Sequence, residues 1–149
     1  AARAARVQGY PAGAIATVEA GLADADIVSA ATLATEPLIA GAALRPGMHI
    51  DLIGAFRPEM CEADAGTFTR ARVFVDTHEG AMDEAGDLLQ AIAAGAIGAD
   101  AIEADLAALC SGAHPGRGSD RDAITLFKSV GTAIEDLAAA ELVAGEHAP

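Results

Sequence analysis

The chain has 149 residues, of which 22 are acidic and 9 basic, so its formal net charge at pH 7 is −13. At this length one domain with one core is the default, and the absence of clustered cations argues against a nucleic-acid partner. No apolar run approaches the roughly 20 residues that a membrane span needs, so we expect no membrane partner. Cys61 and Cys110 are too few for a disulfide framework and fit a reducing compartment, so we predict a cytoplasmic protein.

Short apolar segments in the first half of the chain predict β-strands. They are a weaker candidate at residues 14–18 and three stronger ones at residues 26–32, 48–54 and 71–76. Helical or turn segments separate them, and this alternation is typical of βαβ units with a parallel sheet. Arg45-Pro46-Gly47 predicts a tight turn into the strand at 48–54.

Apolar residues at helical spacing predict three helices in the second half of the chain. These helices are expected at residues 79–94, 101–110 and 123–143. In the last of them, Phe127, Val130, Ile134 and Leu137 step by three and four, the period of one helix face. A loop rich in Gly, Ser and Pro precedes it at residues 112–121.

Charged residues in the second half are expected at the surface. Asp83, Glu84 and Asp87 fall within the helix at 79–94, where we expect them to decorate an exposed face. The four histidines have no metal-ligand spacing with one another or with the cysteines, so no metal site is predicted.

Three of the predicted strands end in Thr32, Gly54 and Asp76. If the sheet is parallel, these residues share its carboxyl edge, where ligands bind in open α/β sheets. Thr32 would supply a hydrogen bond to a ribose or amide group, and Gly54, which lacks a Cβ, would let a planar ring approach the backbone. The alternative is that each is an ordinary residue between strand and loop.

Ser129, Gly131 and Thr132 stand at the start of the last predicted helix. They would present backbone donors to an anion or an amide. The alternative is that Ser129 and Thr132 only cap a turn and that Lys128 is a solvated charge. No G-x-G-x-x-G follows a strand, so the pyrophosphate-binding turn of a dinucleotide fold is absent from the chain.

Five ordered blocks resemble the ornithine cyclodeaminase/mu-crystallin family. The blocks are Thr32–Pro37, Leu44–Met60, Ala71–Asp76, Glu84–Leu88 and Leu126–Asp136. The resemblance is to the C-terminal half of the family's polypeptide. It implies an α/β fold comprising the latter part of a Rossmann-type parallel sheet, with C-terminal helices that pack back onto a substrate and dimerisation domain outside the chain. Residues 1–111 would form a partial NAD(P)-binding domain without the first Gly-rich turn, and residues 112–149 a loop and helix returning toward the substrate domain.

The resemblance also implies an NAD(P)-dependent oxidoreductase that acts on the C–N bond of a small amino acid or cyclic imine. The partners would be NAD(P)H, with NADPH preferred, and a second copy bound through the N-terminal portion. The cofactor-binding residues it implies are Thr32, Asp51, Leu52, Ile53, Gly54 and Ser129. Phe56, Val130 and Gly131 would face the substrate. The family's substrate-clamping Arg and Lys fall upstream, so no catalytic residue is assigned here.

Phe56 stands where the family's cyclodeaminases carry an aspartate that exchanges protons with the substrate amine. An aromatic side chain cannot act as a general acid or base. This difference favours reduction of Δ1-pyrroline-2-carboxylate, or of Δ1-piperideine-2-carboxylate, to L-proline or L-pipecolate. The alternatives are a cyclodeaminase or alanine-dehydrogenase-like activity, a non-catalytic NADP or small-molecule binding protein of mu-crystallin type, and an inert fragment.

Overall fold

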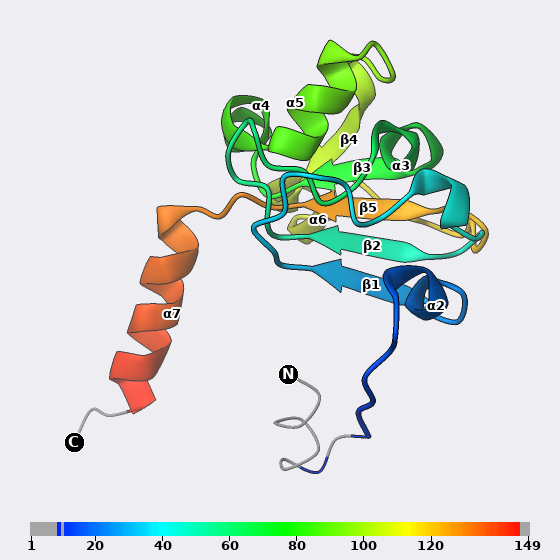
Figure 1. The fold of residues 1–149 in the computed structure, drawn as a ribbon. Coiled ribbons are helices and arrows are strands. Elements are labelled where there is room, and N and C mark those ends of the chain that lie inside the picture. Colours follow the sequence, from blue (N-terminus) through cyan, green and yellow to red (C-terminus); the bar gives the residue numbers. More distant parts are fainter. Residues whose placement is uncertain (1–8, 10, 147–149) are drawn as a thin grey trace.

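The centre of the molecule is a five-stranded parallel sheet (Figure 1). The structure is a computed structural model that describes residue 9 and residues 11–146. The strands are β1 (Ile27–Ala30), β2 (His49–Leu52), β3 (Arg72–Val75), β4 (Ile102–Asp105) and β5 (Thr125–Lys128). Their order across the sheet is β1-β2-β5-β3-β4, so the last strand in the sequence lies in the middle. The predicted parallel α/β class is confirmed.

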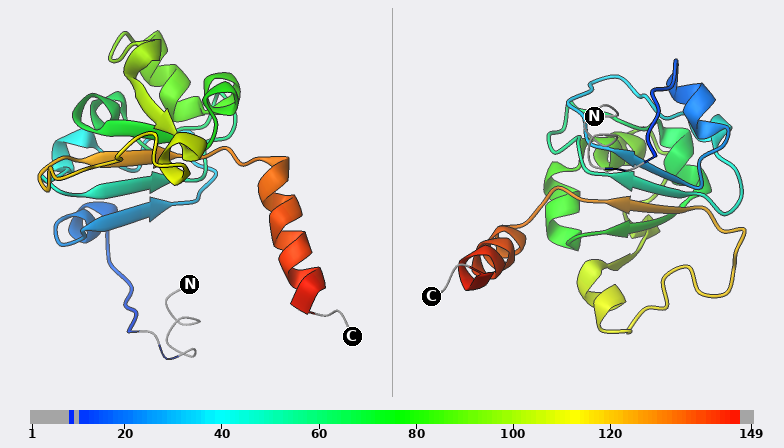
Figure 2. Two further views of the ribbon diagram at one scale, coloured as in Figure 1. Left: turned by 180° about the vertical axis from the view of Figure 1, so that it is seen from behind. Right: turned by 90° about the horizontal axis from the view of Figure 1, so that it is seen from below.

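Helices lie on both faces of the sheet. They are α2 (Val18–Leu22), α3 (Ala65–Arg70), α4 (His78–Glu84), α5 (Gly86–Ala93), α6 (Leu106–Cys110) and α7 (Ala133–Glu146), with 3-10 turns η1 (Gly41–Ala43) and η2 (Ala99–Ala101). Helices α3, α4 and α5 cover one face, and α6 lies against the other (Figures 1 and 2). Helix α7 leaves the carboxyl edge of the sheet and runs away from the body (Figure 2).

The hydrophobic core occupies the face covered by α3, α4 and α5. Because side chains alternate between the two faces of a strand, residues paired in register point the same way. Two such rows enter the core; one is Val28, Ile50, Leu126 and Val73, and the other is Ala30, Leu52, Lys128 and Val75. The second row places a lysine among apolar side chains. The opposite face, which carries α6, is less completely covered, and Ile27 on it is 70% exposed.

One strand prediction and one helix prediction need correction. The three stronger strand candidates are confirmed with shorter bounds, as β1, β2 and β3. The weaker candidate at 14–18 is wrong, because Thr17 caps the start of α2 by accepting a hydrogen bond from the Ala20 amide. The predicted helix at 101–110 begins as strand β4, and Asp105 then caps α6 through the Ala108 amide.

The predicted helix over residues 123–143 is wrong over residues 123–132 and confirmed from residue 133 onward. Residues 125–128 form β5, and the helix begins only at Ala133. Gly131 has a φ of 85°, which is incompatible with a continuous right-handed helix through this segment. Since β5 belongs to the sheet, we propose that the boundary predicted at residue 111 lies instead between Lys128 and Ala133.

The predicted helix at 79–94 is two helices, α4 and α5, separated at Ala85. Gly86, which opens α5, packs against the backbone of the loop after β2, where a Cβ would overlap the carbonyl oxygens of Arg57 and Met60. The break therefore brings α5 against that loop. Among the described residues, no helix is long and apolar enough to cross a membrane.

Candidate functional site

The carboxyl ends of the parallel strands form one edge, as the sequence predicted. The register pairs Ala30 with Leu52, Leu52 with Lys128, and Lys128 with Val75. The residues that follow these four positions therefore emerge along the same edge. They include Thr32, Gly54, Asp76 and the segment Ser129–Gly131, and we call this line the carboxyl edge.

Thr32 is held at the carboxyl edge by a buried carboxylate. Its amide and its hydroxyl both donate to Oε1 of Glu62, at 2.6 Å and 2.8 Å. Glu62 is fully buried, and its own amide donates to Oδ1 of Asp87 at 2.5 Å. Glu62 thus ties the turn after β1 to α5.

Gly54 is explained by packing within the protein. A Cβ at this position would overlap the carbonyl oxygen of Thr32 and the carboxylate of Glu62. The next residue, Ala55, is fully buried with a φ of 46°, an unusual conformation for a residue with a side chain. Its carbonyl accepts from the Gly86 amide at 2.9 Å. The turn after β1 and the Glu62 side chain therefore require a glycine at residue 54, whatever ligand binds.

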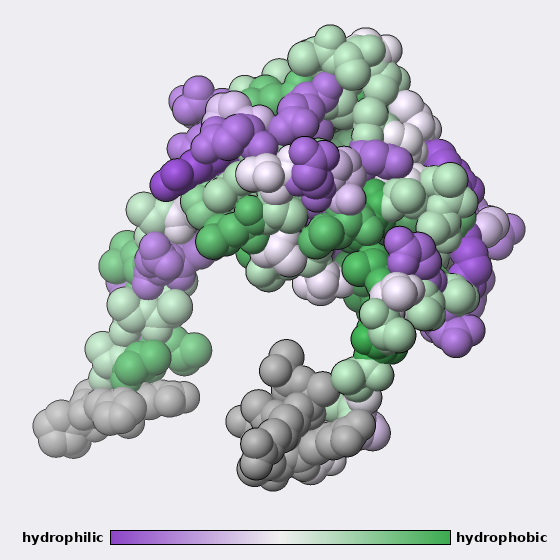
Figure 3. All heavy atoms as spheres, viewed as in Figure 1, coloured by the Kyte–Doolittle hydropathy of each residue, from purple (hydrophilic) through white to green (hydrophobic). Residues whose placement is uncertain are grey.

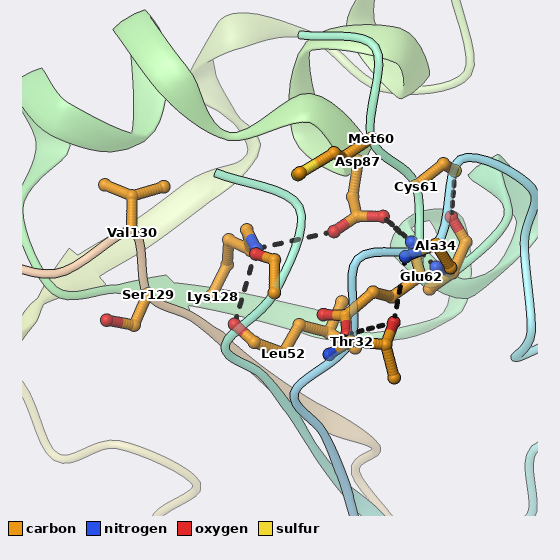
Figure 4. Close-up of polar contacts among 12 residues, drawn as sticks. Thr32, Ala34, Leu52, Met60, Cys61, Glu62, Asp87, Lys128, Ser129 and Val130 are labelled. Carbon is orange, nitrogen blue, oxygen red and sulfur yellow. Dashed lines mark hydrogen bonds and ion pairs between the residues drawn. The ribbon is translucent and has the colours of Figure 1, made fainter. Parts of the chain in front are cut away.

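Lys128 and Asp87 form a fully buried ion pair beneath the carboxyl edge (Figure 4). The Nζ of Lys128 lies 3.5 Å from Oδ2 of Asp87 and donates to the carbonyl oxygens of Leu52 and Gly54. The expectation that Asp87 lies on an exposed helix face is wrong, because α5 turns it toward the sheet. The interpretation of Lys128 as a solvated charge is wrong as well, because alternation along β5 points it into the core.

Burial is the main influence on the ionisation of this pair. It raises the pKa of Asp87, although hydrogen bonds from the Ala63 and Glu62 amides and the charge of Lys128 oppose the increase. Burial likewise lowers the pKa of Lys128, against the attraction of Asp87 and Glu62. Oε2 of Glu62 is buried and has no hydrogen-bond partner. The Glu62 carboxylate is therefore held by Thr32 through Oε1 alone.

Asp76 anchors the segment that follows β5. Its Oδ2 accepts from the Ser129 hydroxyl at 2.9 Å and from the Val130 and Gly131 amides at 2.8 Å each. Burial raises its pKa, but these bonds, with one from the Thr77 amide, outweigh burial and lower the pKa overall. Of the predicted backbone donors, the Gly131 amide is thus used by Asp76 and the Ser129 amide donates to the Leu52 carbonyl at 3.0 Å, and Ser129 does not cap α7.

The other predicted site residues differ in how much surface they offer. Leu52 is fully buried in the core and presents no side-chain surface to a ligand, whereas Ile53 is 42% exposed. The carboxylate of Asp51 accepts from the Ser29 hydroxyl at 2.8 Å. Phe56 is 38% exposed, with the Arg57 guanidinium 5.9 Å from its ring centroid. Val130 is half-buried and Gly131 exposed.

The carboxyl edge carries exposed apolar surface. Leu33 and Ile53 are exposed apolar side chains beside Thr32 and Gly54, and they offer a surface for a flat ring. Apolar surface also gathers on the side of the body where β1 lies, and along α7 (Figure 3). A cavity of about 330 Å³ under α6 is lined by none of the residues predicted to bind cofactor or substrate.

Sequence reasoning missed the buried charges Glu62, Asp87 and Lys128. A usable signal existed at one of them. Glu62 stands between two other acidic residues, Glu59 and Asp64, and nothing local marks it as buried. Lys128 is the only lysine in the chain and occupies an alternating apolar segment.

Comparisons with known proteins identify the family. The model of the ornithine cyclodeaminase/mu-crystallin family matches residues 1–148. A Δ1-pyrroline-2-carboxylate reductase of Paracoccus denitrificans is 44% identical over 133 residues, which is 88% of this chain and 41% of that protein. The ketimine reductase mu-crystallin of Mus musculus is 40% identical over 127 residues, which is 85% of this chain and 37% of that protein.

A solved structure agrees with these relatives. The Thermococcus litoralis Δ1-pyrroline-2-carboxylate reductase, in complex with NADH and L-proline, superposes with a TM-score of 0.87 at 35% identity, over 93% of this chain and 42% of that one. The chain belongs to the ornithine cyclodeaminase/mu-crystallin family and spans about 40% of the length of these relatives. Its sheet is the latter part of the family's Rossmann-type fold.

Proposed function

We propose that the protein containing this chain is an NAD(P)H-dependent oxidoreductase that reduces a cyclic imine carboxylate. The substrate would be Δ1-pyrroline-2-carboxylate or its six-membered homologue Δ1-piperideine-2-carboxylate, and the product L-proline or L-pipecolate. Similarity to two Δ1-pyrroline-2-carboxylate reductases and to a ketimine reductase supports the reaction class.

The observation that carries this proposal is Phe56. It lies in the loop after β2, on the carboxyl edge, and is partly exposed. A phenyl ring cannot accept a proton from a substrate amine, as a cyclodeaminase requires. It can instead form an apolar wall that excludes water and strengthens charge pairing nearby.

The chain's own residues would supply orientation for this reaction. A bound nicotinamide cofactor would supply the hydride, and a protonated imine needs only to be aligned with it. The loop that carries Phe56 is fixed for this task, because Lys128 binds the Gly54 carbonyl and Gly86 binds the Ala55 carbonyl. The groups that clamp the substrate carboxylate would come from the portion of the protein upstream of this chain.

The test is steady-state oxidation of NADPH and of NADH by the full-length protein with Δ1-pyrroline-2-carboxylate. Phe56→Leu keeps an apolar wall and is expected to retain turnover. Phe56→Asp places a negative charge beside an anionic substrate, so kcat/KM is expected to fall about tenfold or more. The ratio of the two kcat/KM values with NADPH and NADH also tests the proposed preference for NADPH.

Turnover of ornithine without reduction of either imine would contradict the proposal and favour a cyclodeaminase. Tight cofactor binding without any turnover would favour a non-catalytic binding protein. Dimerisation through the N-terminal portion is part of the same proposal, and sedimentation of the full-length protein measures it.

A further inference from the structure

The hydroxyl of Thr32 donates its only proton to a buried carboxylate. Oγ1 of Thr32 donates to Oε1 of Glu62 at 2.8 Å. The same Oε1 accepts from the Thr32 amide at 2.6 Å, and a backbone N–H can only donate. Oε1 therefore acts as an acceptor toward Thr32, and the hydroxyl proton points inward.

One of the two lone pairs on the hydroxyl is also used. The Ala34 amide donates to Oγ1 of Thr32 at 3.2 Å. A hydroxyl has one donor and two acceptor sites, so a single acceptor site is left. Thr32 is half-buried and Glu62 fully buried. A ligand at the carboxyl edge thus meets a hydroxyl whose polarity is set from inside the protein.

Ser129 has a related arrangement, with its hydroxyl donating to Asp76 at 2.9 Å and accepting from the Gly131 amide at 3.2 Å. Its exposed fraction is only 8%, which leaves little surface for a ligand. Of the two hydroxyls, that of Thr32 is therefore the one that a ligand at the carboxyl edge can reach.

We propose that Glu62 is a positioning residue that fixes the Thr32 hydroxyl as an acceptor for the carboxamide NH2 of a nicotinamide ring. This inference rests on the proposed function, in which a nicotinamide cofactor binds at this edge. A ribose hydroxyl both donates and accepts, so it gains nothing from a fixed polarity. An NH2 group only donates, and the exposed Leu33 and Ile53 beside Thr32 and Gly54 suit the ring that carries it.

The test compares two ligands on the full-length protein by equilibrium binding, without turnover. NAD+ carries the carboxamide, whereas 3-acetylpyridine adenine dinucleotide carries a methyl ketone in its place. The protein is expected to bind NAD+ about fivefold more tightly, the effect of one neutral hydrogen bond. In Thr32→Val the two affinities are expected to become equal, while in Thr35→Val, an exposed neighbouring threonine, the ratio should be unchanged.

Variants of Glu62 separate positioning from a purely structural role. Glu62→Met removes the acceptor, so the Thr32 hydroxyl is free to turn and the fivefold ratio should disappear. Glu62→Gln keeps an oxygen facing Thr32 and should restore the ratio. If Glu62 has only a structural role, its replacement lowers the affinities for the two dinucleotides by the same factor and leaves their ratio unchanged. If Glu62→Met does not fold, Glu62→Ala, which also removes the acceptor, takes its place, and a ratio that persists in it would contradict the positioning role.

Equal affinity of the unmodified protein for the two dinucleotides, or a ratio that persists in Thr32→Val, would overturn this inference and leave the proposed function intact. Failure to bind either dinucleotide would overturn the proposed function as well.

Discussion

Lys128 shows how one residue can connect several parts of a site that it does not itself line. It lies on the central strand and contacts the carbonyls of Leu52 and Gly54 and the carboxylate of Asp87. Burying such a pair costs desolvation energy that the mutual attraction only partly returns. What the buried lysine adds beyond this balance is its hydrogen bonds to the carbonyls of Leu52 and Gly54. The pair fixes the geometry of the loop after β2 more than it adds net stability.

Removing one partner of this pair should be costly, and removing both should be less so. Lys128→Met leaves the carboxylate of Asp87 buried without a cation, so we expect the free energy of unfolding to fall by about 3 kcal/mol or more. In the double variant, which combines Lys128→Met with Asp87→Asn, neither position carries a charge and none is stranded in the core. Urea unfolding of the four proteins of this cycle measures the coupling. Purely additive effects would contradict a direct interaction.

The Cys61 thiol should be protected from alkylation in the folded protein. Burial, with the charge of Asp87, raises its pKa to about 11, and its Sγ–H donates to the Ala63 carbonyl at 3.2 Å. Only about one thiol in a thousand is then ionised at pH 8, and the thiolate is the reactive form. Mass spectrometry after iodoacetamide treatment should find Cys61 modified only in urea.

This thiol also affects stability at alkaline pH. The unfolded state releases the proton above its ordinary pKa of 9.0, whereas the folded state holds it to about 11. Unfolding should therefore become more favourable as pH rises between these two values. Cys61→Ala should reduce this pH dependence. An equally steep dependence in that variant would contradict the assignment.

At the scale of elements, two carboxylates hold the carboxyl edge together. Glu62 ties the turn after β1 to α5, and Asp76, at the end of β3, ties down the segment after β5. Neighbouring strands of a parallel sheet are about 4.8 Å apart, so the ends of adjacent strands lie within reach of one side chain. The turn after β1 and the segment after β5, both predicted to bind a ligand, are therefore each held by a residue distant in sequence.

Asp76→Asn should loosen the segment after β5 in a pH-dependent manner. An amide cannot accept from all the groups that the carboxylate holds, so we expect the free energy of unfolding at pH 7 to fall by about 1–3 kcal/mol. The pKa of Asp76 is lowered in the folded state, so its contribution is present above the ordinary pKa of 3.8 and is lost as pH falls through the lower folded value.

The difference between wild type and Asp76→Asn should therefore shrink as the solution is acidified below pH 4. Asp83→Asn, at an exposed position of α4, is the matched control and should differ little from wild type at any pH. A difference for Asp76→Asn that stays constant down to pH 2 would contradict the role assigned to its charge.

The elements differ in how far the sequence could predict them. Strands β1, β2 and β3 were predictable because each is a short apolar run followed by a turn. Strand β5 was not predictable, because Phe127 and Val130 also fit a helical period. Lys128 is charged, and a charged residue is expected at the surface rather than on a buried strand. The shared carboxyl edge followed from topology alone. The Glu62–Thr32 and Asp76–Ser129 contacts join residues 30 and 53 positions apart, and no local pattern encodes such contacts.

At the scale of the whole molecule, two groups of exposed apolar side chains lie outside the loop that carries Phe56. Helix α7 exposes Ile134, Leu137 and Leu142, and Ile27 of the edge strand β1 and Leu33 shortly after that strand are also exposed. The chain spans about 40% of the length of its relatives. We therefore expect the portions of the protein outside this chain to cover both surfaces, with α7 packing onto the substrate and dimerisation domain.

This expectation can be tested on α7 in the full-length protein. Ile134 and Leu137, 73% and 57% exposed here, lie three residues apart and so share one side of the helix. If the rest of the protein covers them, replacing both by serine removes buried apolar volume and should lower the free energy of unfolding by about 2 kcal/mol or more for each. Ala139→Ser, two residues beyond Leu137, alters the other side of the helix and should have a small effect. Equal stabilities of the double variant and the control would show that α7 stays exposed in the complete protein, and would contradict its packing onto another domain.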